Sequence, residues 1–124
     1  MPTFKQLALP TLMGLSVLGV SALADSGHDL SGAYTMNGQG NLPADPPYGG
    51  RCELTLNDRV YTATCVNNNG DRYVGKGIQE GEIFSLYLGE YLVVYRVGPD
   101  RILTGRWAHA RSPGTGRETL TPIQ

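Results

Sequence analysis

Hydrophobic and polar residues alternate along most of the chain after residue 29, with the period of two that is typical of half-buried β-strands. Short runs of glycine, asparagine and proline interrupt the alternation and predict tight turns. No segment beyond residue 24 has the period of an amphipathic helix. Eight short strands are therefore expected, at residues 30–37, 51–57, 60–66, 71–78, 82–88, 91–97, 102–108 and 117–122.

This order of strands predicts an all-β fold, a small antiparallel up-and-down β-barrel of about eight strands. Closure of such a meander leaves no long unpaired edge. An open β-sandwich is the alternative architecture. The main interruption falls at residues 38–50, where Pro43, Pro46 and Pro47 and two glycine pairs predict a long irregular loop.

Two cysteines, Cys52 and Cys65, flank a turn candidate at Asp58-Arg59. A two-residue loop there places the cysteines opposite each other on the apolar face, in the closer, non-hydrogen-bonded type of pair. A four-residue loop with the same register is equally acceptable, because Asp-Arg is not a favoured turn dipeptide. We expect a structural disulfide and not a redox pair, since the spacing is not Cys-x-x-Cys and no histidine lies nearby.

Two further registers follow from the alternation. A two-residue loop at residues 89–90 places Phe84 opposite Tyr95 on a continuous apolar face. A loop of odd length after the next strand places Trp107 on that same face. A loop of even length would turn Arg106 inward, which is costly for an unpaired charge, so the odd loop is expected.

The first 24 residues depart from this pattern. Lys5 precedes an uncharged apolar run at residues 7–20, and Ala22-Leu23-Ala24 follows as a small-x-small cleavage site. We expect a signal peptide at residues 1–24 and a single domain at residues 25–124. A retained membrane anchor is the alternative, but the run is short for a membrane span. The expected location is secreted, with the periplasm as the compartment.

Composition narrows the classes of partner. The chain has a formal net charge of −1 and no basic cluster, which argues against nucleic acid and anionic lipid as partners. Neither of the two histidines, His28 and His109, has acidic residues or cysteines at ligand spacing, so no metal and no cofactor are expected. No serine has the context of a catalytic nucleophile. We expect no catalytic residues and no enzymatic activity.

Several aromatic and basic side chains are candidates for contact with a ligand or partner. The aromatic ones could line the mouth of a pocket, although such residues more often fill the core of a small barrel. The basic ones could meet an acidic partner, although outward charges also keep a barrel soluble. The candidates are Tyr34, Tyr73, Tyr91, Tyr95, Arg96, Arg106 and Trp107.

A Gly-x-aromatic triplet occurs twice, at Gly32-Ala33-Tyr34 and at Gly105-Arg106-Trp107. With the strand meander, it resembles the avidin- and lipocalin-type barrels that are collectively calycin-like. Several segments also resemble small secreted bacterial proteins of undefined function; they are residues 73–78, 93–97, 103–107 and 118–122. Avidins enclose biotin with several tryptophans and this chain has one, so the resemblance does not imply biotin binding.

The resemblance implies a secreted, non-enzymatic binding or envelope-accessory protein, expected to be a monomer, whose partner is an unidentified small molecule or secreted protein. Bacterial secreted proteinase inhibitors have a similar layout, a small barrel with one disulfide. The alternative function is therefore inhibition of a secreted hydrolase, through the loop at residues 38–50 or the segment after residue 25.

Overall fold

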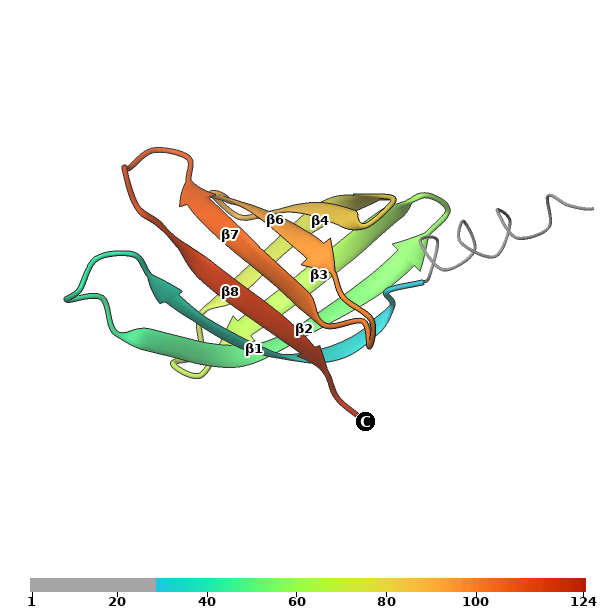
Figure 1. The fold of residues 1–124 in the computed structure, drawn as a ribbon, viewed down its shortest axis with the longest axis horizontal. Coiled ribbons are helices and arrows are strands. Elements are labelled where there is room, and N and C mark those ends of the chain that lie inside the picture. Colours follow the sequence, from blue (N-terminus) through green and yellow to red (C-terminus); the bar gives the residue numbers. More distant parts are fainter. Residues whose placement is uncertain (1–28) are drawn as a thin grey trace, which may run out of the picture.

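The chain forms eight antiparallel strands that close into a barrel (Figure 1). The hydrophobic residues of the alternating pattern point into the barrel. The computed structural model describes residues 29–124, and the expected signal peptide and His28 lie outside this range. The strands are β1 (Gly32–Gly40), β2 (Pro47–Asn57), β3 (Val60–Asn67), β4 (Arg72–Glu80), β5 (Ile83–Leu88), β6 (Tyr91–Val97), β7 (Leu103–His109) and β8 (Thr115–Pro122). Each strand pairs with the next, and β8 pairs with β1, which confirms the up-and-down barrel. In the described part of the chain, no helix has the length and hydrophobicity to cross a membrane.

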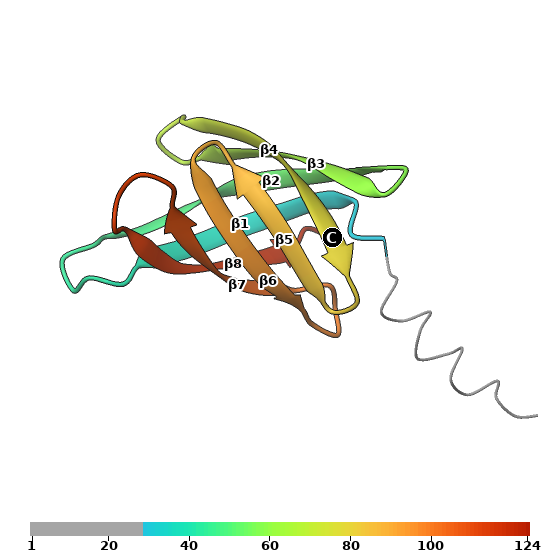
Figure 2. The same ribbon diagram turned by 90° about the horizontal axis from the view of Figure 1, so that it is seen from above.

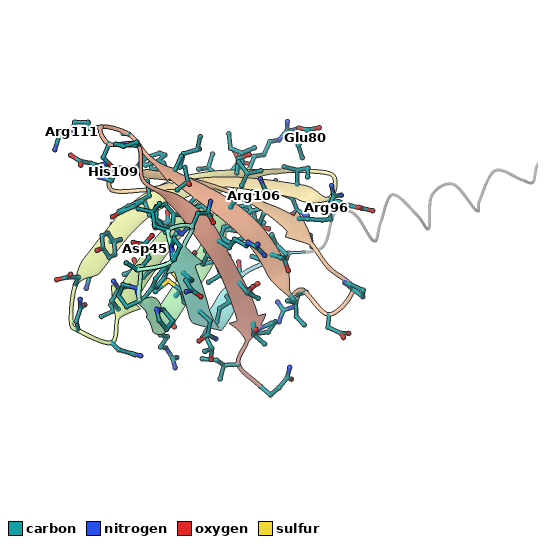
Figure 3. All side chains as sticks on the ribbon, turned by 60° about the vertical axis from the view of Figure 1, so that its left-hand side comes forward. Asp45, Glu80, Arg96, Arg106, His109 and Arg111 are labelled. Atoms are coloured by element: carbon teal, nitrogen blue, oxygen red, sulfur yellow. A yellow bond between two sulfur atoms is a disulfide. The ribbon has the colours of Figure 1, made fainter. Side chains whose placement is uncertain are left out.

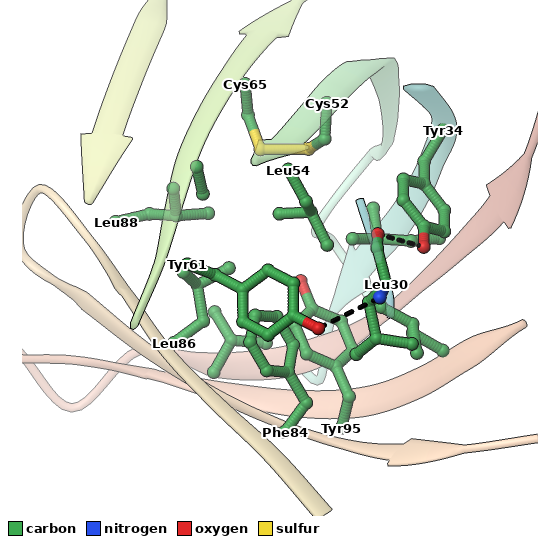
Figure 4. Packing of buried hydrophobic residues seen from close by; sticks show 14 of the residues in the cluster. Leu30, Tyr34, Cys52, Leu54, Tyr61, Cys65, Phe84, Leu86, Leu88 and Tyr95 are labelled. Atoms are coloured by element: carbon green, nitrogen blue, oxygen red, sulfur yellow. Dashed lines mark hydrogen bonds between the residues drawn. A yellow bond between two sulfur atoms is a disulfide. The ribbon is translucent and has the colours of Figure 1, made fainter. Parts of the chain in front are cut away.

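The hairpin of β2 and β3 has the register expected from the cysteines. Asn57 is opposite Val60, so the loop has two residues, Asp58 and Arg59. Cys52 is opposite Cys65, and the two form a disulfide inside the barrel (Figure 4). Its half-cystines are fully buried, so the bond is part of the core as well as a link between strands.

The two other predicted registers are also confirmed. Phe84 is opposite Tyr95 across β5 and β6. The loop at residues 98–102 has an odd number of residues, so Trp107 turns inward and Arg106 outward, opposite Val94 on the outer face. Where the loop is short, only a few registers are possible, and the one that buries the apolar face is adopted.

The prediction of a long irregular loop at residues 38–50 is wrong. Most of it is regular hairpin, because β1 extends to Gly40 and β2 begins at Pro47, which leaves a loop at residues 41–46. Pro47 is tolerated because it is the first residue of its strand, where the missing N–H costs least. The glycines of this segment are also compatible with a strand, because a strand position that faces a crowded interior needs no side chain.

The two ends of the barrel differ. At the closed end, Leu30 lies across the opening; its N–H donates to the Tyr61 hydroxyl oxygen (2.9 Å) and its carbonyl accepts from the Tyr34 hydroxyl (2.6 Å) (Figure 4). The opposite end, the open end, carries the loops at residues 41–46, 68–71, 89–90 and 110–114. Figures 1 and 2 show the hairpin of β1 and β2 and the β7–β8 loop together at this end.

Two inward glycines of β4 explain part of the tight packing. A Cβ on Gly75 would lie 1.6 Å from the Tyr87 carbonyl oxygen, and one on Gly77 would lie 2.7 Å from the Phe84 ring. Their lack of side chains therefore lets neighbouring groups approach closely inside a narrow barrel, and they do not line the cavity described below.

Candidate functional site

The packed core does not fill the barrel to its open end. A cavity of about 790 Å³ lies there, bounded by β1, the 41–46 loop, residues 67–69 and the β7–β8 loop. Its lining is mainly apolar and includes Leu42, Tyr73, Leu88, Tyr91 and Val93. This volume is in the range of sites that hold small organic molecules.

Two cross-strand pairs of a glycine and an aromatic residue keep the cavity open. Tyr48 of β2 is opposite Gly38 of β1, and Trp107 of β7 is opposite Gly116 of β8. A Cβ on Gly38 would lie 2.2 Å from the Tyr48 ring, and one on Gly116 would lie 2.3 Å from the indole. Each ring therefore covers the neighbouring glycine and lies along the barrel wall, which leaves the centre free.

Glu118 of β8 is a carboxyl group inside the barrel, only 6 % exposed, and it lines the cavity. Its carboxylate accepts hydrogen bonds from the hydroxyls of Tyr48 (2.7 Å) and Tyr95. Burial raises the pKa of Glu118, and the two hydrogen bonds oppose part of that rise. Burial, followed by the nearby Glu118 charge, also raises the pKa of both tyrosines. Among residues 29–124, Glu118 forms no ion pair.

Three aromatic side chains form what we call the aromatic wall, Tyr73, Tyr91 and Trp107. Their rings meet edge to face, at centroid distances of 5.9 Å for Tyr73 with Tyr91 and 5.4 Å for Tyr91 with Trp107. Among residues 29–124, the buried Trp107 N–H has no hydrogen-bond partner. It lies close enough to Tyr48 to oppose a small part of the rise in the pKa of that tyrosine. The wall thus offers ring faces and edges to the cavity.

The rim of the open end carries a small ionic cluster. Glu90 pairs with His109 (3.1 Å) and with Arg111 (2.5 Å), and the imidazole packs against the Tyr91 ring. Figure 3 shows His109 and Arg111 close together at this end. The strand expected at residues 102–108 extends one residue further, to His109, because His109 still pairs with Tyr91 of β6. Within the described range, no group of three potential ligands could hold a metal ion.

The structure brings four of the seven candidate contact residues to this site. Tyr73, Tyr91 and Trp107 line the cavity, and Tyr95 lies below it and donates to Glu118. Three of these aromatic side chains therefore surround open space, and Tyr95 belongs to the core.

The other three candidates lie elsewhere. Tyr34 is fully buried at the closed end. Arg96 and Arg106 point outward, and Arg96 lies 3.7 Å from Glu82 in an exposed ion pair (Figure 3). None of them lines the cavity.

Sequence reasoning missed Glu118 and Tyr48. Glu118 alternates with Gly116 and Leu120, and Leu120 is fully buried, so the alternation places a carboxyl on the core side of β8. That signal was present in the sequence. Tyr48 was hidden by the loop assigned to its segment, and finding it required the β1–β2 register.

Comparison with known proteins does not extend this description. Neither a scan against protein-family models nor a search of the curated proteins found a match for the chain. The closed antiparallel barrel of eight strands agrees with a calycin-like layout at the level of architecture. Because a fold by itself does not define a function, the cavity is the feature of this barrel that bears on function.

Proposed function

We propose that the protein is a secreted, non-enzymatic binding protein that holds a small molecule in the cavity at the open end of its barrel. The observation that carries the proposal is a buried carboxyl, Glu118, in the wall of a mainly apolar cavity. An apolar cavity with a few convergent polar groups is the usual form of a small-molecule site.

The position of Glu118 is costly for stability. A buried carboxylate without a cation disfavours the folded state, and an apolar residue would fill the same space at lower cost. The tyrosines that hold it, Tyr48 and Tyr95, are fixed by neighbouring glycines or by the core. A costly group held in a defined position beside open space supports a binding role.

Secretion is supported by two features. The expected signal peptide at residues 1–24 directs export, and the Cys52–Cys65 disulfide suits an oxidising compartment. The resemblance of several segments to small secreted bacterial proteins also supports a secreted location, and it is part of this proposal.

Trp107 provides the test, because it is the only tryptophan of the chain and lines the cavity. We expect at least one class of small molecule to change its fluorescence saturably and to raise the melting temperature. Val93→Phe places a ring in the cavity and should weaken that binding about tenfold or more. Val94→Phe, the same change on the outer face of β6, should leave it unchanged. Equal weakening by both variants, or no saturable ligand in a library of varied charge and shape, would contradict the proposal.

Inhibition of a secreted hydrolase is a second candidate, supported by the loop at residues 41–46. Leu42 is 67 % exposed there, and Asp45 fixes the loop through its carboxylate, which accepts from the Leu42 N–H (3.0 Å). A rigid loop with an exposed apolar residue suits insertion into an active-site cleft. Inhibition of a secreted protease in a panel, lost in Leu42→Asp, would support this function; no inhibition of any member would exclude it for that panel.

A further inference from the structure

The charged side chains that line the cavity are all acidic. Within residues 29–124 they are Asp45 and Glu118, and no lysine, arginine or histidine joins them in the lining. Two basic groups at the rim of the open end, His109 and Arg111, are paired with Glu90. Because an apolar surround weakens screening, these two carboxylates make the cavity attractive to cations and unfavourable for anions.

Glu118 also retains acceptor capacity. A carboxylate has about four acceptor sites, and the hydrogen bonds from Tyr48 and Tyr95 use one on each oxygen. Both partners are neutral donors, so they hold the carboxylate in place without balancing its charge. A cationic donor would supply the positive charge that residues 29–124 do not provide to Glu118.

The aromatic wall suits the same kind of ligand. Ring faces of tryptophan and tyrosine attract ammonium groups, and the attraction strengthens when water is excluded. The buried N–H of Trp107 does not reach the cavity surface as an exposed donor, so it offers nothing to an anionic ligand. The same rings provide apolar area for the body of an organic molecule.

We propose that the ligand is a small organic cation, with its ammonium group directed to Glu118 and its apolar body against the aromatic wall. This inference rests on the proposed binding function. It specifies charge and shape: one positive group that can donate hydrogen bonds, on an apolar or aromatic body that fits a cavity of about 790 Å³.

Three probe molecules of similar size separate charge from shape. Phenethylamine is a cation at neutral pH, phenethyl alcohol is neutral, and hydrocinnamate is an anion. Trp107 fluorescence titration of the protein purified after expression of the full chain measures the three affinities. We expect phenethylamine to bind about tenfold or more tightly than the alcohol, and hydrocinnamate to bind most weakly.

Glu118→Gln tests the source of that preference. The variant keeps the size of the side chain and removes its charge, so phenethylamine should lose about tenfold or more in affinity and approach the alcohol. Glu82→Gln is the matched control, because Glu82 is exposed in the β4–β5 turn at the closed end, and it should bind as the wild type does. The comparison of the three probes on the wild type needs no variant and holds even if Glu118→Gln folds poorly.

The outcomes distinguish the two proposals. Preference for phenethylamine that disappears in Glu118→Gln and survives in Glu82→Gln supports the inference. Equal binding of amine and alcohol, or tightest binding of hydrocinnamate, overturns the cation and leaves the binding function standing. Failure of all three probes, together with failure of the broader library, overturns both.

Discussion

Substitution of Gly116 by alanine should disturb the cavity wall more than the size of one methyl group suggests. The added Cβ would lie 2.3 and 2.4 Å from two carbons of the Trp107 indole and 2.5 Å from the Gln39 carbonyl oxygen on β1. One obstacle is a half-buried ring packed against the core and the other is backbone, so neither can move away cheaply. Overpacking of this kind costs about 1–3 kcal/mol.

For a domain of this size, each 1 kcal/mol lowers the melting temperature by roughly 4–8 °C, so a loss of about 10 °C is expected. Trp107 reports the same event locally, because a displaced indole becomes more exposed and its emission shifts to longer wavelength. Thermal unfolding followed by circular dichroism, together with the emission spectrum of the folded state, measures both effects.

Gly114→Ala is the matched control. The nearest neighbours of its Cβ would be the Ser112 Oγ at 3.3 Å and an indole carbon of Trp107 at 3.8 Å, which are tolerable contacts. Its stability should change by no more than about 0.5 kcal/mol. If Gly116→Ala melts with the wild type and its emission is unchanged, Trp107 does not lie over Gly116 and our explanation of the open cavity is wrong.

Three further predictions concern charge, the disulfide and a turn. Burial raises the pKa of Glu118 above its ordinary value of 4.5, so protonation of Glu118 stabilises the folded state. This contribution to stability is fully present below about pH 4.5. The stability of the wild type relative to Glu118→Gln, measured by urea denaturation, should therefore fall as pH rises from about 4.5 and level off above the folded-state pKa; a difference that grows with pH would contradict this. Replacement of both Cys52 and Cys65 by alanine should lower the free energy of unfolding by about 3 kcal/mol, and unchanged stability would mean that the bond is absent in solution. Asp58 has a φ of 63°, a conformation that glycine adopts without strain, so Asp58→Gly should stabilise the protein by about 0.5–1 kcal/mol. Arg59→Gly is the control and should bring no such gain. Thermal denaturation of both variants measures the difference.

The registers could be predicted from the sequence because they depend on the side chains themselves. At the Cys52–Cys65 and Phe84–Tyr95 pairs, a shift of one residue would turn an apolar face to water, so the alternation and the short loop leave one solution. Local pattern and tertiary packing agree there, and prediction is correspondingly accurate.

The site was less predictable for a physical reason. Glycine has no side chain to show which way a position faces, so the strand through Gly38 and Gly40 read as a loop, and the pairing of Tyr48 was lost with it. The cavity depends on which residue lies opposite each glycine, and this is known only once the register is known. Prediction of Glu118 as a site residue would have meant placing a charged side chain at an inward position, although charged residues are usually exposed.

The central claim, that the open end of the barrel holds a small organic cation, is tested most directly by nuclear magnetic resonance. Titration with phenethylamine should shift the indole N–H resonance of Trp107 and the backbone amides of Val93 and Glu118, which surround the cavity. The amides of Asp58 and Gly81, in turns at the other end of the barrel, should stay where they are. Shifts confined to that other end or to the outer face, or no saturable shift at all, would contradict the account.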